Sequence, residues 1–149
     1  MDEARALNIR GPLNDVDTKA MPAPPARIKV MVVDDQADVR FLVRMLLEDA
    51  GGEFTVVAEA DGIDGMLERI DEADPDILLM DARMPRVDGF QAAPMVLERR
   101  PGQQIVLLTG LDDEAVRERA TAAGIAEVVS KDNFDALPDV LRRVGAPAV

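Results

Sequence analysis

The sequence contains no cysteine and no histidine among its 149 residues. Without cysteine the chain cannot form disulfides, and it offers no thiolate to zinc or to an iron–sulfur cluster. Without histidine it lacks the usual ligand for soft metals, and both Ser-His and Cys-His nucleophilic catalysis are excluded. Any metal bound here would therefore be a hard cation held by oxygen atoms.

Long apolar runs and basic charge are also scarce. No apolar stretch approaches the roughly 20 residues that cross a bilayer, and the N-terminus lacks an apolar segment of signal-peptide length, so neither membrane insertion nor export is expected. The formal net charge is −12, which disfavours direct binding to nucleic acid because such binding needs a basic face. Together with the absence of cysteine, these features predict a cytoplasmic protein that is kept soluble by its acidity.

The composition, 48% hydrophobic and 31% charged, is typical of a globular domain. Residues 1–26 hold four prolines and no sustained apolar period, which predicts an extended or disordered tail. The predicted domain covers residues 27–145, and residues 146–149 form a short C-terminal tail. Because the sequence stops just after the last predicted helix, we expect a domain that acts alone.

Apolar segments of two kinds alternate along this domain. Five short segments that are apolar on both faces predict strands, at residues 28–33, 54–58, 77–80, 104–109 and 126–131. A segment with apolar residues at helical spacing follows each of them, which predicts five helices. This alternation predicts an α/β fold of the flavodoxin-like type, a doubly wound five-stranded parallel sheet with strand order 2-1-3-4-5.

The sequence also indicates where three of the helices begin, two of them only as alternatives. Asp61 is interpreted as the cap of the second helix, and Asp132 or Asn133 as the cap of the last one. Pro94 falls where the third helix is expected, and a proline in a helix interior costs about 3 kcal/mol. Either that helix starts late, with Pro94 in its first turn, or it is kinked.

Polar residues stand where four of the predicted strands end. Asp34 and Asp35 follow the first strand and Asp81 follows the third, while Thr109 ends the fourth and Lys131 ends the fifth. In the order 2-1-3-4-5 these strand ends adjoin, so three carboxylates, one hydroxyl and one ammonium are expected in one crevice. Clustered carboxylates repel unless a cation neutralises them, and this oxygen-only trio suits Mg²⁺. The combination describes a receptor for a phosphoryl group, with Asp81 as the nucleophile.

Taken one at a time, these residues have plainer explanations. Asp34 and Asp35 could end a strand and cap a helix, and Asp81 could be an ordinary polar residue of a loop. Thr109 could be structural, and Lys131 could be a solvated charge. Only their joint placement at one edge of the sheet points to a phosphoryl site.

Four segments of the chain, in this order, resemble the receiver domain of two-component response regulators. They are VVDD at 32–35, LLMDARMPRVDG at 78–89, LLTG at 107–110 and the strand end at Lys131. The resemblance covers residues 28–144, nearly all of the predicted fold. It implies that Asp81 is a phosphoacceptor, taking its phosphoryl group from a phosphohistidine of a sensor histidine kinase or phosphotransfer protein.

The resemblance also implies roles for the residues around this aspartate. Asp35 would bind Mg²⁺ directly, Asp34 directly or through water, and the backbone carbonyl of Arg83 would supply another ligand. Thr109 would move to hydrogen-bond one phosphoryl oxygen, and Lys131 would pair with another. Phosphorylation would then bias a two-state equilibrium and alter a face that is read by a downstream protein or by a second copy of the chain, as in a homodimer.

Two positions depart from the family pattern. Val128 stands three residues before Lys131, where the family has an aromatic switch residue, and Asp132 follows the lysine, where the family has a proline. Both bear on how phosphorylation is transmitted, and they favour as an alternative a receiver-like scaffold that binds its partner without phosphorylation. A second alternative is a Mg²⁺-dependent phosphohydrolase, although such enzymes show a strand-end Asp-x-Asp motif followed by a cap insertion, whereas this sequence has Asp34-Asp35 at the strand end and no insertion. The main prediction is a signalling protein and not an enzyme.

Overall fold

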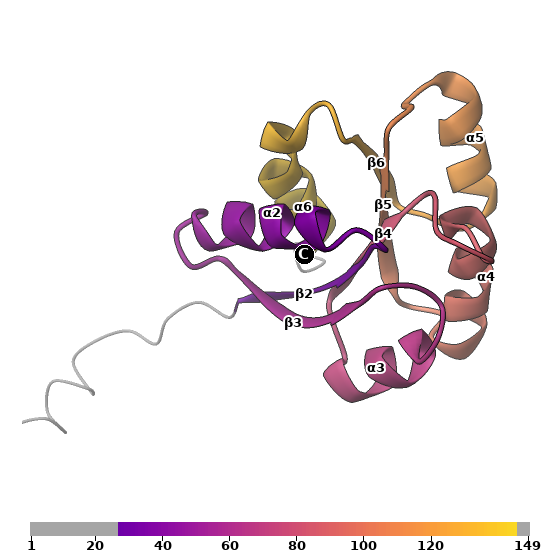
Figure 1. Cartoon of the computed structure of the whole chain (residues 1–149), viewed down its shortest axis with the longest axis horizontal. Coiled ribbons are helices and arrows are strands. Elements are labelled where there is room, and N and C mark those ends of the chain that lie inside the picture. The colour runs from indigo at the N-terminus through magenta and orange to yellow at the C-terminus, as the bar shows by residue number, and fades with distance from the viewer. Residues whose placement is uncertain (1–26, 146–149) are drawn as a thin grey trace, which may run out of the picture.

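The computed structural model describes residues 27–145, and its elements are labelled as in Figure 1. The predicted tails at 1–26 and 146–149 lie outside the described residues, and the domain boundaries stay a prediction. The strands are β2 (Ile28–Val33), β3 (Phe54–Ala60), β4 (Ile77–Asp81), β5 (Gln104–Thr109) and β6 (Glu127–Ser130). The helices are α2 (Ala37–Glu48), α3 (Met66–Ala73), α4 (Gly89–Arg99), α5 (Glu114–Ala122) and α6 (Leu137–Gly145), with the 3-10 turn η1 (Phe134–Ala136) before α6.

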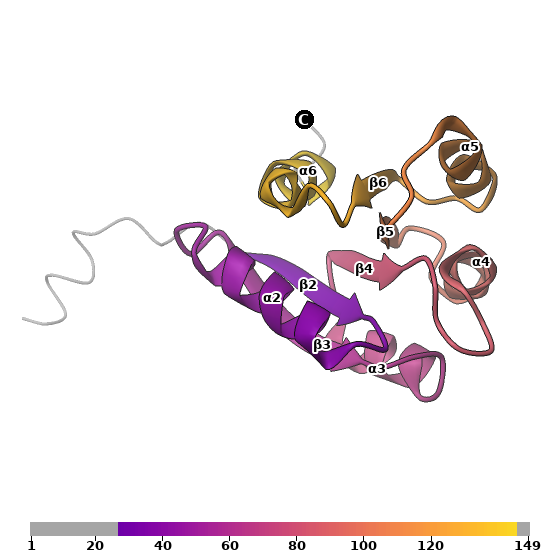
Figure 2. The ribbon, with the colours of Figure 1, turned by 45° about the horizontal axis from the view of Figure 1, so that its top comes forward.

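The five strands form one parallel sheet in the order β3-β2-β4-β5-β6. Numbered along the described chain this is the order 2-1-3-4-5, so the predicted flavodoxin-like fold is confirmed. Helices α2 and α6 cover one face of the sheet, and α3, α4 and α5 cover the other (Figure 1 and Figure 2). Because all strands run the same way, their carboxyl ends meet at one edge, where ligands of such sheets bind.

The central strand β4 is buried on both sides. Its residues alternate between two hydrophobic cores: Ile77 and Leu79 pack on the side of α2 and α6, and Leu78 and Met80 on the side of α3, α4 and α5. A strand covered by helices on both faces has no polar face, which explains its continuous apolar sequence. Its last residue, Asp81, is also buried.

Helix α3 begins later than the sequence suggested. It starts at Met66, after Gly65, which occupies the cap position in the left-handed region with φ 72°. Glycine adopts this conformation without the penalty of a side chain. Asp61 is exposed and lies five positions before the first helical residue, so its predicted role as the cap is wrong.

Helix α4 begins at Gly89 and contains Pro94 in its interior. The side chain of Asp88 accepts a hydrogen bond from the Gln91 N–H at 2.8 Å, and the Gln91 side chain accepts one from the Asp88 N–H at 3.1 Å. This reciprocal capping fixes the start of the helix five residues before the proline. The alternative of a late start with Pro94 in the first turn is therefore wrong.

The last helical segment begins with η1, and Asn133 occupies its cap position without a side-chain cap hydrogen bond. Of the two expected caps, Asn133 therefore has the position but not the interaction. Asp132 is exposed, and its N–H donates to Ser130 Oγ at 3.1 Å. Within residues 27–145, no helix is long and apolar enough to cross a membrane.

Candidate functional site

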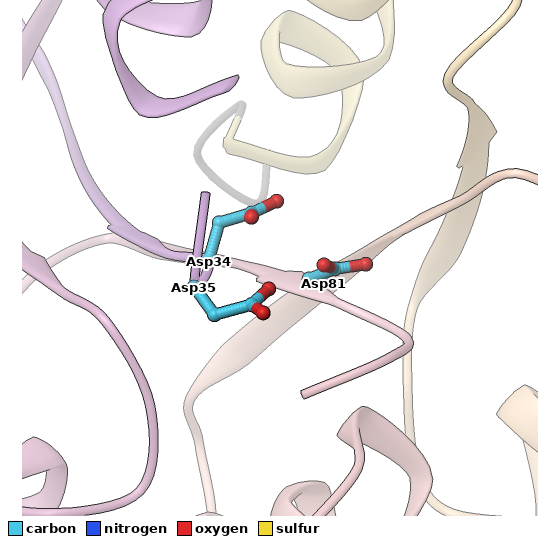
Figure 3. A group of neighbouring side chains, drawn as sticks. All are labelled: Asp34, Asp35 and Asp81. Atoms are coloured by element: carbon cyan, nitrogen blue, oxygen red, sulfur yellow. The ribbon is translucent and has the colours of Figure 1, made fainter. Parts of the chain in front are cut away.

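Three carboxylates meet where β2 and β4 end (Figure 3). Asp34, Asp35 and Asp81 each offer one carboxylate oxygen, and these oxygens all lie within 4.8 Å of one another. The two strands are paired neighbours at the centre of the sheet, with Val33 opposite Met80, so the residues at their ends project into the same space. Asp34 and Asp81 are buried and Asp35 is exposed. The expected convergence of these three carboxylates is present in the structure.

Lys131 brings a positive charge to this cluster from the end of β6. Its Nζ lies 3.1 Å from Asp81 Oδ1 and 3.5 Å from Asp34 Oδ2. Its backbone N–H donates to the Thr109 carbonyl at 2.7 Å, which ties the end of β6 to the end of β5. One ammonium group faces three carboxylates, so the site keeps an excess of negative charge that favours a further cation.

Thr109 lies at the end of β5 and is buried. Its hydroxyl donates to the Leu111 carbonyl at 3.0 Å and accepts a hydrogen bond from the Leu111 N–H at 3.1 Å. Both hydrogen bonds lie within its own loop. The hydroxyl would have to leave the Leu111 carbonyl to donate to a group on Asp81, and the expected movement of Thr109 stays a prediction.

Arg83 follows the buried Asp81 by two positions, in the loop after β4. Its N–H donates to Asp81 Oδ1 at 3.2 Å, so this oxygen is held by both Arg83 and Lys131. The side chain of Arg83 is exposed. The expected role of its backbone carbonyl as a metal ligand stays a prediction.

The buried carboxylate of Asp34 tests whether these residues suit a cation. Its Oδ1 accepts a hydrogen bond from the Gln36 N–H at 2.8 Å, whereas its Oδ2 has the Lys131 ammonium at 3.5 Å but accepts no hydrogen bond from the part of the chain that the structure describes. Burial raises the pKa of Asp34, and the nearby Asp81 and Asp35 carboxylates raise it further, against the opposing effects of the Gln36 N–H and Lys131. A buried carboxylate oxygen without a hydrogen bond, beside two other carboxylates, fits a hard cation such as Mg²⁺.

The Asp34→Asn variant is expected to be more stable than the wild type in Mg²⁺-free buffer at pH 7, because burial and the neighbouring carboxylates disfavour the charged form of Asp34. The amide occupies the same space, but it carries no buried charge and can donate to the neighbouring carboxylates. Because the folded-state pKa of Asp34 is raised, its favourable contribution to folding is present at acidic pH and is lost as the pH rises through that pKa. The advantage of the variant should therefore grow from acidic to neutral pH. Urea unfolding followed by circular dichroism measures it.

Mg²⁺ should reverse this ranking. A ligand at 100 times its dissociation constant stabilises the folded state by about 2.7 kcal/mol, and the variant should gain much less because a ligand has been removed. Equal stabilisation of both proteins by Mg²⁺ would contradict the assignment of Asp34 to the cation site.

Sequence reasoning missed two residues beside this site, Arg40 and Glu59. The guanidinium of Arg40 donates to the backbone carbonyl of Asp34 at 2.5 Å and to Glu59 Oε1 at 3.1 Å. The spacing of Arg40 along α2 marks it only as a polar helix residue. Its contacts depend on where β3 places Glu59, which no local pattern reveals.

Comparison with known proteins identifies the class to which this site and fold belong. Residues 30–142 match the family model described as the response regulator receiver domain, and the chain belongs to that family. Receiver domains of two-component response regulators act in phosphorylation-based signalling. The resemblance inferred from the sequence motifs is thereby confirmed.

The relatives differ in how much of their length this chain covers. The chain is 33% identical over 118 residues to the chemotaxis protein CheY of Halobacterium salinarum, covering 76% of this chain and 96% of that protein. It is 35% identical over 104 residues to the response regulator GacA of Pseudomonas syringae pv. syringae, covering 70% and 48%. It thus spans about half the length of this GacA relative.

The fold has close counterparts among solved structures. The receiver domain of the putative response regulator NarL from Mycobacterium tuberculosis is 31% identical, with a TM-score of 0.72 over 83% of this chain and 100% of that one. The chemotaxis protein CheY4 of Vibrio cholerae is 28% identical, with a TM-score of 0.70 over 80% and 99%. These likenesses extend over the sheet and its helices.

Proposed function

We propose that this chain is a phosphorylation-controlled switch that accepts a phosphoryl group on Asp81 from a phosphohistidine of a sensor histidine kinase or phosphotransfer protein. One observation carries the proposal: the carboxylate oxygens of Asp34, Asp35 and Asp81 lie within 4.8 Å of one another, and Lys131 Nζ lies 3.1 Å from Asp81. The lack of cysteine fits such a protein in the cytoplasm.

The transfer uses Asp81 as the nucleophile. A carboxylate oxygen of Asp81 forms the new bond to phosphorus, while the bond from phosphorus to the donor imidazole nitrogen breaks and its electron pair stays on that nitrogen. Asp34, Asp35, Asp81 and the carbonyl of Arg83 would hold Mg²⁺, which when bound neutralises charge on the phosphoryl oxygens. Asp34 is buried and fixed by the Gln36 N–H, so it holds its orientation while the donor enters and leaves.

Lys131 and Thr109 bind the transferred group. The ammonium of Lys131, already beside Asp81, pairs with one phosphoryl oxygen and offsets its charge. The Thr109 hydroxyl leaves the Leu111 carbonyl and donates to another phosphoryl oxygen. This exchange releases Leu111, whose side chain is 59% exposed, so the surface beside the site changes when Asp81 is modified.

This change of surface would be the output signal. A downstream protein, or a second copy of the chain, would bind one form more tightly than the other, because a ligand shifts an equilibrium only by its differential affinity. The direct test measures phosphoryl uptake by intact mass after incubation with acetyl phosphate, with and without Mg²⁺. Uptake that needs Mg²⁺ supports the proposal, and no uptake in its presence contradicts it.

A constitutive scaffold is the second candidate. Val128, half-buried on β6, stands where the family has an aromatic switch residue, so the coupled movement of Thr109 lacks its usual aromatic partner. An NMR experiment with beryllofluoride, which mimics the phosphoryl group, separates the two candidates. Beryllofluoride-induced changes in the amide resonances of residues 109–111 support the switch, whereas phosphoryl uptake by a protein that shows no such changes favours the scaffold.

Replacing Lys131 with alanine is expected to slow phosphoryl uptake by about 100-fold at saturating Mg²⁺, since removing one preorganised charge at a reacting centre has effects of this size. The affinity for Mg²⁺ should not weaken, because the loss of the ammonium leaves the three carboxylates more negative. The time course of uptake at several Mg²⁺ concentrations gives both quantities.

Lys29→Ala is the control for the loss of a lysine charge. Lys29 lies on β2 and its Nζ is 4.0 Å from Asp74 Oδ2, away from the three carboxylates. Its replacement should leave uptake within about twofold of the wild type. A Lys131→Ala variant that matched the Lys29 control in rate would remove Lys131 from the proposed chemistry.

A further inference from the structure

A second charged cluster lies directly beside the acidic site. Glu59 Oε1 accepts a hydrogen bond from Arg40 Nε at 3.1 Å, its other oxygen pairs with the guanidinium of Arg44, and its backbone carbonyl accepts from Arg69. The side chains of Arg40 and Glu59 are only 20% and 23% exposed. A pair this shielded from water is screened much less by salt than an ion pair on the open surface.

A bulge in β3 directs Glu59 toward α2. The pairing register with β2 shifts after Val56, so that Val57 is an extra residue without a partner. Val56 packs with the core on the side of α2 and α6, but Ala58 packs with the core on the opposite side. Uninterrupted alternation would have left Ala58 on the α2 side and turned Glu59 away from it. The extra residue reverses the alternation and brings Glu59 to the arginines of α2.

Arg40 connects this cluster to the acidic site. The guanidinium that binds Glu59 also donates to the backbone carbonyl of Asp34 at 2.5 Å. The N–H of Asp34 in turn donates to the carbonyl of Ala60 at 3.0 Å. Both peptide groups that flank Asp34 are therefore anchored at the end of β3, one directly and one through Arg40. The second of these groups leads into Asp35, so its orientation also directs the neighbouring carboxylate.

We propose that Arg40, held by Glu59, is a positioning residue that fixes the Asp34–Asp35 backbone in the conformation that binds the cation. This inference rests on the proposed function above. Three carboxylates within 4.8 Å repel one another, and a backbone free to turn would relieve that repulsion by separating them. Arg40 opposes the separation, so less of the binding free energy is used to order the site. Its positive charge is offset by Glu59, so it acts through geometry.

The test compares Mg²⁺ affinities from NMR titrations of the full chain. Arg40→Ala should bind Mg²⁺ about 10-fold more weakly, the lower end of the effect usual for residues that orient metal ligands. Arg44→Ala is the matched control: it also loses an ion pair with Glu59, but the contact of Arg40 with Asp34 remains. It should stay within about twofold of the wild type. The amide of Gln36, which donates to Asp34 Oδ1, reports the local geometry.

Phosphoryl uptake supplies a second readout that a general loss of structure would not reproduce. In Arg40→Ala the Mg²⁺ concentration for half-maximal uptake should rise about 10-fold, while the rate at saturating Mg²⁺ stays within about threefold of the wild type. Arg40→Lys keeps one donor for the Asp34 carbonyl but not the guanidinium fork to Glu59. Its Mg²⁺ concentration for half-maximal uptake should therefore lie between those of Arg40→Ala and the wild type.

Each outcome is decisive. Unchanged Mg²⁺ affinity in Arg40→Ala, or equal weakening in Arg44→Ala, would overturn the positioning role while leaving the proposed function intact. A wild type that neither binds Mg²⁺ nor takes up a phosphoryl group would overturn both. If Arg40→Ala does not fold, Glu59→Gln decides: weaker Mg²⁺ binding by several-fold supports the role, and wild-type binding rejects it.

Discussion

Asp81→Asn is expected to lower phosphoryl uptake from acetyl phosphate by at least about 10³-fold, to the limit of detection. The amide fills the same buried space at the end of β4, but its oxygen is not a nucleophile toward phosphorus. One carboxylate fewer also reduces the repulsion around Asp34, so the fold should be kept. Intact mass after incubation with Mg²⁺ and acetyl phosphate measures uptake, and circular dichroism checks the fold.

Asp132→Asn is the matched control for this experiment. Asp132 is an exposed carboxylate directly after Lys131, and it is not among the three that cluster. Its replacement should leave uptake within about twofold of the wild type. Uptake by Asp81→Asn at the wild-type level would mean that another group accepts the phosphoryl, and the proposed function would then fail in its central assignment.

The fold could be predicted because each strand is recognisable from its own sequence. Strands buried on both faces read as continuous apolar runs, and two of them, β2 and β5, have the predicted limits. Strand β3 extends two residues further, through Glu59 and Ala60. Judged from the neighbouring residues alone, a glutamate at this position indicates that the strand has ended. The bulge at Val57 and the arginines of α2 are what accommodate it.

The acidic site could also be predicted, because strand order alone brings the residues after parallel strands to one edge. Asp34, Asp81 and Lys131 meet there without any knowledge of side-chain geometry. Contacts that depend on tertiary detail could not be predicted. Arg40 forms hydrogen bonds with both Glu59 and the Asp34 carbonyl, and the Thr109 hydroxyl forms its hydrogen bonds with Leu111 in its own loop.

Helix starts show the same limit. Asp61 has the chemistry of a cap, yet the chain turns through Gly65 and begins α3 at Met66. In α4 the reciprocal bonds of Asp88 and Gln91 mark the start at Gly89, and the helix continues through Pro94 despite its missing N–H. Local preferences amount to about 1 kcal/mol for a cap, and packing against the sheet outweighs them.

Gly89→Ala is expected to lower the free energy of unfolding by about 3 kcal/mol, the upper part of the range for an overpacked site. A Cβ at this position would lie 2.6 Å from the backbone oxygen of Asp81 and 2.7 Å from Leu107 Cδ1. The Leu107 side chain can turn aside, but the Asp81 oxygen belongs to the backbone of a central strand. Alanine favours a helix over glycine by at most about 1 kcal/mol, which is too little to offset the clash.

The clash also reaches the candidate site. The Gly89 N–H donates to the Ala82 carbonyl at 3.0 Å, so the start of α4 is bound to the residue after Asp81. Relief of the contact must move α4 away from β4 or displace the Asp81 peptide group, and either change weakens Mg²⁺ binding as well as stability. Gly102→Ala is the control, because a Cβ at that exposed turn meets nothing within 4 Å. Urea unfolding of the control should match the wild type within about 1 kcal/mol. Equal stability of the two variants would mean that the close approach of α4 to Asp81 does not constrain the site.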